Sequence, residues 1–199
     1  MSKAHNVYSV LTVAFILASF AFADNVLADS RVDTTYYPNG SIQWERRYVD
    51  ELQDGLSRKY YENGKLQGES EFSKGALQGP FRTYYPHGIL ESELFYNQDQ
   101  IHGVGKFYYE DGTIQRMVHF KDGVRHGQAI DYYANGNIKA EWMYLDDKLN
   151  GQMKMFYEAG GVRAITMFHD GERNGQTHMF DNLGSLIETQ QYRQGKRMR

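Results

Sequence analysis

The sequence predicts an all-β protein, an elongated single-layer antiparallel β-meander of stacked 24-residue β-hairpin repeats. Two observations carry this prediction: glycines recur every 24 residues, and apolar residues alternate with polar ones between them. The composition agrees with a folded chain, because an aromatic fraction of 15% is too high for a disordered protein. With 20 Gly, 3 Pro and no glycine at every third position, a collagen-like chain is also excluded.

The glycine columns define the repeat. Without insertion or deletion, the 24-residue interval separates Gly40, Gly64, Gly88, Gly112, Gly136, Gly160 and Gly184. A second column keeps the same interval at Gly55, Gly79, Gly103, Gly127, Gly151 and Gly175. Aromatic pairs and single aromatics stay in phase with both columns, from Tyr36-Tyr37 to Phe156-Tyr157 and from Tyr48 to Tyr192. We therefore expect about seven repeats over 36–199, preceded by a short lead-in at 29–35.

Each repeat is predicted to be a β-hairpin. The first glycine column often follows Asn or Asp, and Asn-Gly and Asp-Gly favour turns that need a positive φ. If Asn63-Gly64 is a two-residue loop, Tyr61 faces Leu66 and Arg58 faces Glu69. A three-residue loop with a glycine bulge moves that register by one residue, and both alternatives remain open.

The strands follow from the alternation after each turn. Ile138, Ala140, Trp142 and Tyr144 occupy every second position, which is typical of a half-buried antiparallel strand. Stacking the hairpins gives about 14 strands, and a spacing of ~4.8 Å between strands predicts a rod roughly 65 Å long. Each repeat then contacts only its neighbours, so stability is expected to be a sum of repeat and interface contributions.

An N-terminal segment has the composition of a secretory signal peptide. Lys3 precedes an uncharged run from Asn6 to Ala23, and small residues mark two processing sites, after Ala23 and after Ala28. We expect residues 1–28 to be this signal peptide and to direct export to the periplasm or the extracellular space. The alternative is an uncleaved membrane anchor, because about 18 uncharged residues is the lower limit for crossing a bilayer.

Two copies show the repeat motif most fully: Tyr60-Tyr-Glu-Asn-Gly-Lys-Leu66 with Phe72-Ser-Lys-Gly75, and Tyr108-Tyr-Glu-Asp-Gly-Thr-Ile114 with Phe120-Lys-Asp-Gly123. This motif resembles the MORN-repeat variant, which occurs in bacterial proteins described as YwqK-type and antitoxin-like. The resemblance covers residues 36–199. It implies an elongated antiparallel sheet of hairpins that is used for binding rather than catalysis.

Two surfaces are candidates for binding. The first is an aromatic column on the more polar face, where stacking on a partner or on sugar rings competes with a purely structural cross-strand ladder: Tyr60, Tyr84, Tyr108, Tyr132 and Phe156. The second is the opposite face, expected to carry Tyr61, Leu66 and Phe72. No helix-forming segment after residue 30 covers this apolar face, so we expect a partner protein or a homodimer to do so.

Catalysis and metal binding find little support. The chain has no Cys, and the repeated glutamates Glu45, Glu69, Glu93 and Glu141 lack the contrasting environments that an acid and a base need. His102 and His126 lie one repeat apart, too far to share a zinc ion without further ligands. We therefore expect no enzyme activity and no cofactor or metal. A net charge of −3 gives no reason to expect nucleic acid, while the basic tail from Arg193 to Arg199 suits an anionic membrane surface.

These features together predict an exported, non-enzymatic repeat scaffold that binds another protein through aromatic and apolar rows. The first alternative is a cell-wall or glycan-binding module, since tandem tyrosine-rich hairpins also resemble such repeats. Those repeats are richer in Trp, and this chain has only Trp44 and Trp142. The second alternative is an antitoxin-like protein that neutralises a partner toxin.

Overall fold

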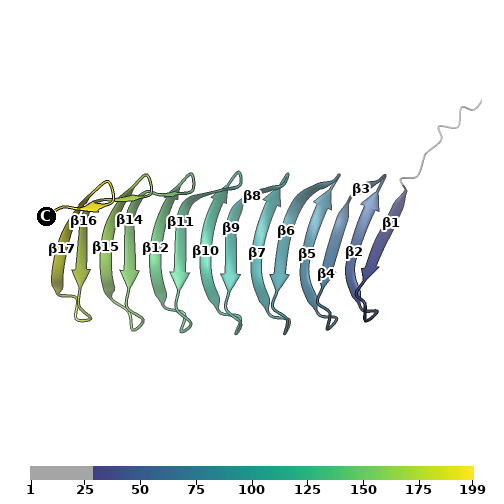
Figure 1. Ribbon diagram of the computed structural model, residues 1–199, viewed down its shortest axis with the longest axis horizontal. Coiled ribbons are helices and arrows are strands. Elements are labelled where there is room, and N and C mark those ends of the chain that lie inside the picture. Colours follow the sequence, from purple (N-terminus) through teal and green to yellow (C-terminus); the bar gives the residue numbers. More distant parts are fainter. Residues whose placement is uncertain (1–28) are drawn as a thin grey trace, which may run out of the picture.

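The computed structural model describes residues 29–199, and the predicted signal peptide lies outside them. These residues form one open antiparallel sheet of eighteen strands, lying side by side as a long, curved layer (Figure 1). The strands are β1 (Ser30–Tyr36), β2 (Ile42–Val49), β3 (Leu52–Gln53), β4 (Gly55–Tyr60), β5 (Leu66–Ser73), β6 (Ala76–Tyr84), β7 (Leu90–Asn97), β8 (Gln100–Ile101), β9 (Gly103–Tyr108), β10 (Ile114–Lys121), β11 (Val124–Tyr132), β12 (Ile138–Leu145), β13 (Lys148–Leu149), β14 (Gly151–Phe156), β15 (Val162–His169), β16 (Glu172–Phe180), β17 (Leu186–Arg193) and β18 (Lys196–Arg197).

The predicted meander is confirmed. Every strand pairs with its neighbours along the chain, and no connection crosses the sheet. Three long strands are each interrupted at one residue, between β3 and β4, β8 and β9, and β13 and β14. If each interrupted pair is taken as one strand, the described chain has fourteen long strands and the short β18. The lead-in at 29–35 is almost entirely β1, so it joins the sheet as a strand.

The first glycine column lies in three-residue loops. The Tyr61 N–H donates to the Lys65 carbonyl over 2.8 Å, and the Gly64 N–H donates to the Tyr61 carbonyl over 2.9 Å. A bulge at Gln67 then restores the register, so that Arg58 pairs with Glu69 as the two-residue alternative also required. The pairing of Tyr61 with Leu66 is wrong, because the longer loop places Leu66 opposite Tyr60. The seven loop glycines have φ between 81° and 101°.

A second set of turns connects the other ends of the strands. Each has two residues with positive φ, as in Lys74 (49°) and Gly75 (88°), which is the geometry of a type I′ turn. The other six are Asp50-Glu51, Gln98-Asp99, Asp122-Gly123, Asp146-Asp147, Asp170-Gly171 and Gln194-Gly195. Sequence reading missed these tight turns because three of the seven have Glu or Asp where Gly is expected.

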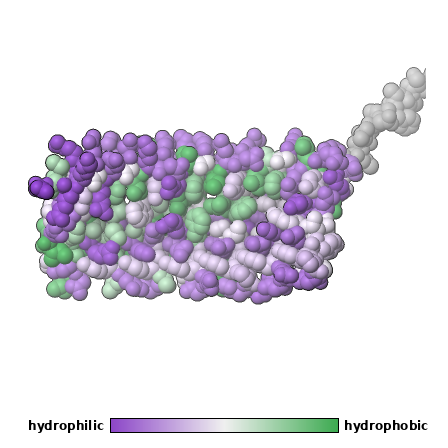
Figure 2. All heavy atoms as spheres, viewed as in Figure 1, coloured by the Kyte–Doolittle hydropathy of each residue, from purple (hydrophilic) through white to green (hydrophobic). Residues whose placement is uncertain are grey.

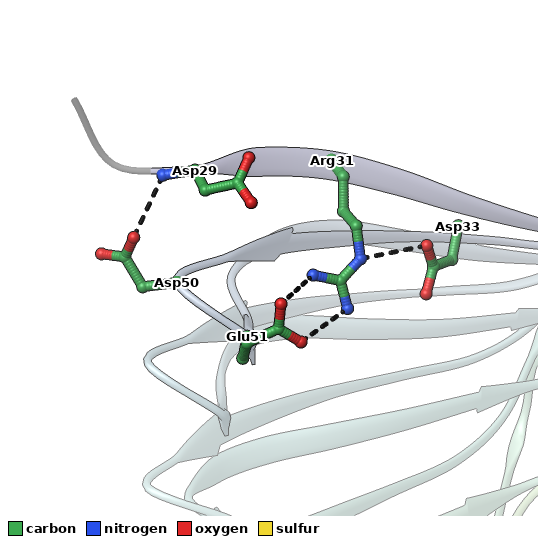
Figure 3. A network of polar contacts seen from close by, with 5 residues as sticks. All are labelled: Asp29, Arg31, Asp33, Asp50 and Glu51. Carbon is green, nitrogen blue, oxygen red and sulfur yellow. Dashed lines mark hydrogen bonds and ion pairs between the residues drawn. The ribbon is translucent and has the colours of Figure 1, made fainter. Parts of the chain in front are cut away.

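The first two-residue turn is held against β1 by polar contacts (Figure 3). Arg31 donates from Nη1 and Nη2 to the two carboxylate oxygens of Glu51, over 2.7 and 3.0 Å, and from Nε to Asp33. The Asp29 N–H donates to Asp50 Oδ1 over 3.0 Å. The Asp50 N–H donates in return to the Asp29 carbonyl. In each later turn the N–H of the second turn residue makes the corresponding bond, to the carbonyl 22 residues earlier. Residue 29 therefore already takes part in the hydrogen bonding of the array.

The second tyrosine of each pair links successive repeats. Its hydroxyl donates to the main-chain carbonyl that lies 23 residues further along, over 2.7 to 2.9 Å. Six residues repeat this bond: Tyr37, Tyr61, Tyr85, Tyr109, Tyr133 and Tyr157. The seventh copy has Asp181 at this place. These tyrosines therefore connect neighbouring repeats. Tyr61 had been expected to belong to the apolar face of the sheet instead.

We expect Tyr109→Phe to destabilise the protein by about 1 kcal/mol, because the variant loses the hydroxyl that donates to the Tyr132 carbonyl. Chemical denaturation measures the change. Tyr36→Phe is the matched control, since its side chain is 61% exposed and its hydroxyl has no hydrogen-bond partner among residues 29–199. Equal losses in the two variants would contradict a role for the hydroxyl in linking repeats.

Candidate functional site

The strand register assigns the side chains to two faces. One face carries every residue that is buried in the described chain, and we call it the core face: Ser57, Ser70, Ser92, Gly105, Val118, Ala129, Asp131, Ala140, Met153, Thr166, Thr177 and Tyr192. Most of these residues are small, and they are shielded by larger neighbours on adjacent strands, not by a second layer. Among residues 29–199 no element covers this face. Figure 2 shows hydrophobic residues gathered along the middle of the array between hydrophilic rims.

On the core face, the second glycine column lies opposite the single aromatics. Gly79 pairs with Tyr96, Gly127 pairs with Tyr144, and the same pairing recurs in the other repeats. These glycines have φ between 84° and 111°, a range that L side chains rarely adopt. A Cβ atom at Gly79 would lie 2.9 Å from a carboxylate oxygen of Glu71, so a side chain has little room there. The two columns are therefore in phase because they pair across strands.

The opposite face, the ladder face, carries a row of alternating charges. In register across successive strands lie Glu45, Arg58, Glu69, Arg82, Glu93 and Lys106. Arg82 donates from Nε to Glu93 over 2.9 Å and from Nη1 to Glu69 over 3.2 Å. The hydrogen bond to Glu93 is the main cause that raises the pKa of Arg82 above its usual value. The repeated glutamates are thus members of a structural charge row.

The predicted partner-binding column starts from the same face. Tyr60, Tyr84, Tyr108, Tyr132 and Phe156 are all half-buried. The Tyr60 hydroxyl donates to Glu45 over 2.6 Å, and the Tyr84 hydroxyl donates to Glu69 over 3.1 Å. The Tyr132 hydroxyl lies 3.7 Å from the sulfur of Met117. These contacts give the column a structural role, and its use by a partner stays a prediction.

Burial raises the pKa of several phenols, among them Tyr60, Tyr84 and Tyr108, with neighbouring glutamates adding to the effect. A phenol whose pKa is higher in the folded state stabilises the fold below its unfolded value and loses that contribution as the pH rises. We therefore expect the stability to fall once the pH exceeds about 10. Urea unfolding at increasing pH measures this, and Tyr84→Phe makes the fall less steep. A stability that stays constant above that pH would contradict the raised pKa values.

Three hollows follow the core face. The N-terminal hollow, of about 250 Å³, lies between Trp44 and Phe81. The central hollow, of about 370 Å³, has Phe107 and Phe120 among its walls. The C-terminal hollow, of about 320 Å³, is lined largely by methionines, namely Met153, Met155 and Met179. Of the predicted partner-binding residues, Tyr132 contributes to the central hollow, and the other four do not.

A charged cluster borders the central hollow. Asp131 is nearly buried, with 12% of its side chain exposed, and it accepts hydrogen bonds from Arg116 Nε and Nη2, over 2.5 and 2.9 Å. The Trp142 indole N–H donates to the same carboxylate over 3.2 Å. The bond to Asp131 is the main cause that raises the pKa of Arg116. Sequence reading missed this cluster, because its three residues come from three strands and occur in only one repeat.

Two more cations line the same hollow. Arg125 lies 4.5 Å from the centre of the Tyr144 ring and donates to Asp147 at the rim. Lys139 lies 5.7 Å from the centre of the Tyr133 ring, at the bulge that follows a three-residue loop. Cations beside aromatic rings are attracted by the ring electrons, which holds them in place. The hollow therefore has apolar walls and a positively charged border.

Within residues 29–199, the histidines and glutamates do not assemble into a metal centre. His102 Nδ1 lies 3.6 Å from Asp122, and His126 Nδ1 lies 3.0 Å from Asp146, so each imidazole has a separate carboxylate at the rim. Within the part of the chain that the structure describes, no group of three His, Asp or Glu side chains could hold a metal ion. In the same residues, no helix is long and apolar enough to cross a bilayer.

The geometry agrees with the comparison against known families. The MORN repeat variant matches residues 53–74, 77–98, 101–122 and 125–146. These four tandem stretches are similar to the MORN repeat variant. Each match begins two residues before a glycine of the second column and ends at the first residue of the following two-residue turn. It therefore contains one three-residue loop and the two strands that this loop connects. No curated protein matches the chain. MORN repeats are scaffold units for interaction with proteins and membranes, and the YwqK-type, antitoxin-like assignment stays a prediction.

Proposed function

We propose that this protein is a non-enzymatic scaffold of MORN repeats that binds another protein along its core face. The observation that carries the proposal is the core face, which no element of residues 29–199 covers and which has three hollows along its length. A sheet with one apolar face is stabilised when another layer covers it. The repeats offer the partner many similar contacts. Each contact is weak, but their contributions add up because the repeats are linked in one rigid array.

Export is the second part of the proposal. The uncharged run that ends at Ala23, with small residues before both processing sites, supports secretion to the periplasm or the extracellular space. The partner is then a protein of the cell envelope or the medium. The mass of the N-terminal peptide of the natural protein tests this part, because cleavage after Ala23 or Ala28 leaves a mature chain that starts at Asp24 or Asp29.

Site-specific photo-crosslinking tests the scaffold role. A photoreactive phenylalanine analogue replaces Phe107 on the core face or, as the matched control, Phe95, which lies on the ladder face and is 50% exposed. The two variants are illuminated in an envelope extract, and crosslinked proteins are identified by mass spectrometry. We expect a defined partner at position 107 that position 95 does not capture. A third variant at Tyr108 tests the predicted aromatic column.

The outcomes separate the alternatives. Crosslinks at Tyr108 and not at Phe107 would move the partner to the ladder face and leave the scaffold role in place. A crosslink between two copies of this chain at Phe107 would identify the homodimer. Retention on cell-wall glycan beads, with no protein crosslinked at any position, would overturn the proposal in favour of a glycan-binding module.

A further inference from the structure

The charges of this chain are unevenly distributed over the core face and its rims. The whole chain has a net charge of −3. The three hollows of the core face, however, are lined by six cations and two carboxylates: Lys59, Arg116, Arg125, Lys139, Arg163 and Arg173, with Glu69 and Asp131. Asp131 is already occupied by Arg116 and Trp142. The hollows are therefore positively charged sites on an acidic protein.

The two rims that border the core face have the opposite sign. Seven of the fourteen residues in the two-residue turns are acidic, and Lys74 alone is basic. The three-residue loops add four acidic residues and no Lys or Arg: Glu62, Glu110, Asp111 and Glu158. Arg31, Arg125 and Lys148 pair with three of the turn carboxylates. A wide anionic surface such as a membrane would meet both rims and be repelled by the remaining carboxylates. A narrow anionic segment avoids the rims when it lies along the hollows.

We propose that the core face binds an acidic segment of the partner protein, one in which carboxylates alternate with aromatic or aliphatic side chains. The proposal rests on the scaffold function proposed above and adds the chemistry of the partner. The cations of the hollows pair with the carboxylates, and the apolar walls receive the side chains between them. Charge complementarity of this kind mainly sets the choice of partner and the rate of encounter.

The central hollow is the principal anchor. Arg116 holds Asp131 through Nε and Nη2, so its Nη1 points away from that carboxylate, and 53% of the side chain is exposed. Arg125, Lys139 and Phe107 line the same hollow. Arg116 is paired with Asp131 and Arg125 with Asp147, so three cations face two carboxylates and leave one excess positive charge, at Lys139, beside two phenylalanine rings. A carboxylate flanked by apolar side chains matches this arrangement.

The N-terminal hollow repeats the chemistry on a smaller scale. Arg46 lies 4.4 Å and Lys59 5.2 Å from the centre of the Trp44 ring, and neither forms an ion pair within residues 29–199. Gly68 lies in the same hollow, where a Cβ atom would come within 3.2 Å of the Arg82 carbonyl. About four strands separate the centres of successive hollows, which corresponds to roughly 20 Å. A segment long enough to span two hollows gains from both.

Fluorescence anisotropy with labelled peptides tests this proposal on the full chain. The probe is a short peptide of alternating Glu and Phe, with Gln-Phe and Lys-Phe peptides of the same length as references. We expect the Glu-Phe peptide to bind most tightly. Arg125→Gln and Lys139→Gln each weaken its binding by about fivefold to tenfold, and raising the salt concentration weakens it further. The matched control, Lys106→Gln, removes one charge from the ladder face and changes the affinity by less than about twofold.

Several results would overturn the proposal. These are equal affinity for the Glu-Phe and Lys-Phe peptides, an equal effect of Lys106→Gln and Lys139→Gln, and tighter binding of oligothymidine or phosphatidylglycerol vesicles than of the acidic peptide. The two proposals fail separately. If a partner is crosslinked at position 107 and Arg125→Gln and Lys139→Gln do not affect its capture, the scaffold role stands and the proposed acidic segment is refuted. The absence of any crosslinked partner removes the scaffold role itself.

Discussion

Gly127→Val is expected to lower the free energy of unfolding by about 2 to 4 kcal/mol, the larger of the two main effects predicted for this chain. Gly127 has φ at 103°, outside the region that valine adopts without strain. A Cβ atom there would also lie 3.4 Å from the Cβ of His119 on the adjoining strand, so further methyl groups have little room. Urea denaturation measures the change.

Gly123→Asp is the matched control, four residues earlier on the same side of the hairpin. Gly123 is the second residue of a two-residue turn, and Asp147 occupies the equivalent place one repeat later with φ at 66°. We expect this substitution to change the stability by less than about 0.5 kcal/mol. Two equally damaging substitutions would show that loss of any glycine is harmful, and would refute the distinct role of the second glycine column.

Arg116→Ala is expected to destabilise the fold by about 2 to 3 kcal/mol, because it leaves the nearly buried carboxylate of Asp131 with only the Trp142 indole as a partner. The same variant weakens binding of the Glu-Phe peptide. Arg116→Lys keeps the charge but cannot form both hydrogen bonds, and so recovers only part of the stability. Differential scanning calorimetry and urea denaturation provide independent measurements.

Lys148→Ala is the control for this second prediction. Lys148 also forms a short ion pair, with Asp170 over 2.6 Å, but 58% and 66% of the two side chains are exposed. Exposed pairs contribute little, since water already solvates both charges. We expect the unfolding midpoint to stay unchanged. A loss as large as that of Arg116→Ala would mean that burial of the carboxylate does not set the cost.

The fold could be predicted from the sequence because every repeat carries the same information. Seven copies in phase reinforce a glycine or aromatic column that would be ambiguous in one hairpin. The loop length could not be predicted, because Asn63-Gly64 suits both a two-residue and a three-residue loop. The bulge at Gln67 then restores the shorter loop's register at Arg58 and Glu69, so that pairing alone does not distinguish the alternatives.

The candidate site was less accessible to sequence reading for the opposite reason. Repetition draws attention to what all copies share, such as the tyrosine pairs, and these residues turn out to link repeats or hold a structural charge row. Arg116, Asp131 and Trp142 occur in single copies and meet only through the strand register. The signal that could have found them is departure from the repeat pattern, at positions that the register places side by side.

The orientation of the strands has a mechanical consequence. The strands lie across the long axis of the array, so the hydrogen bonds between them run along it (Figure 1). A force that pulls the two ends apart therefore loads the strand pairs in series, and each pair carries the full tension. Such an array separates first at its weakest strand pair and then opens one hairpin at a time.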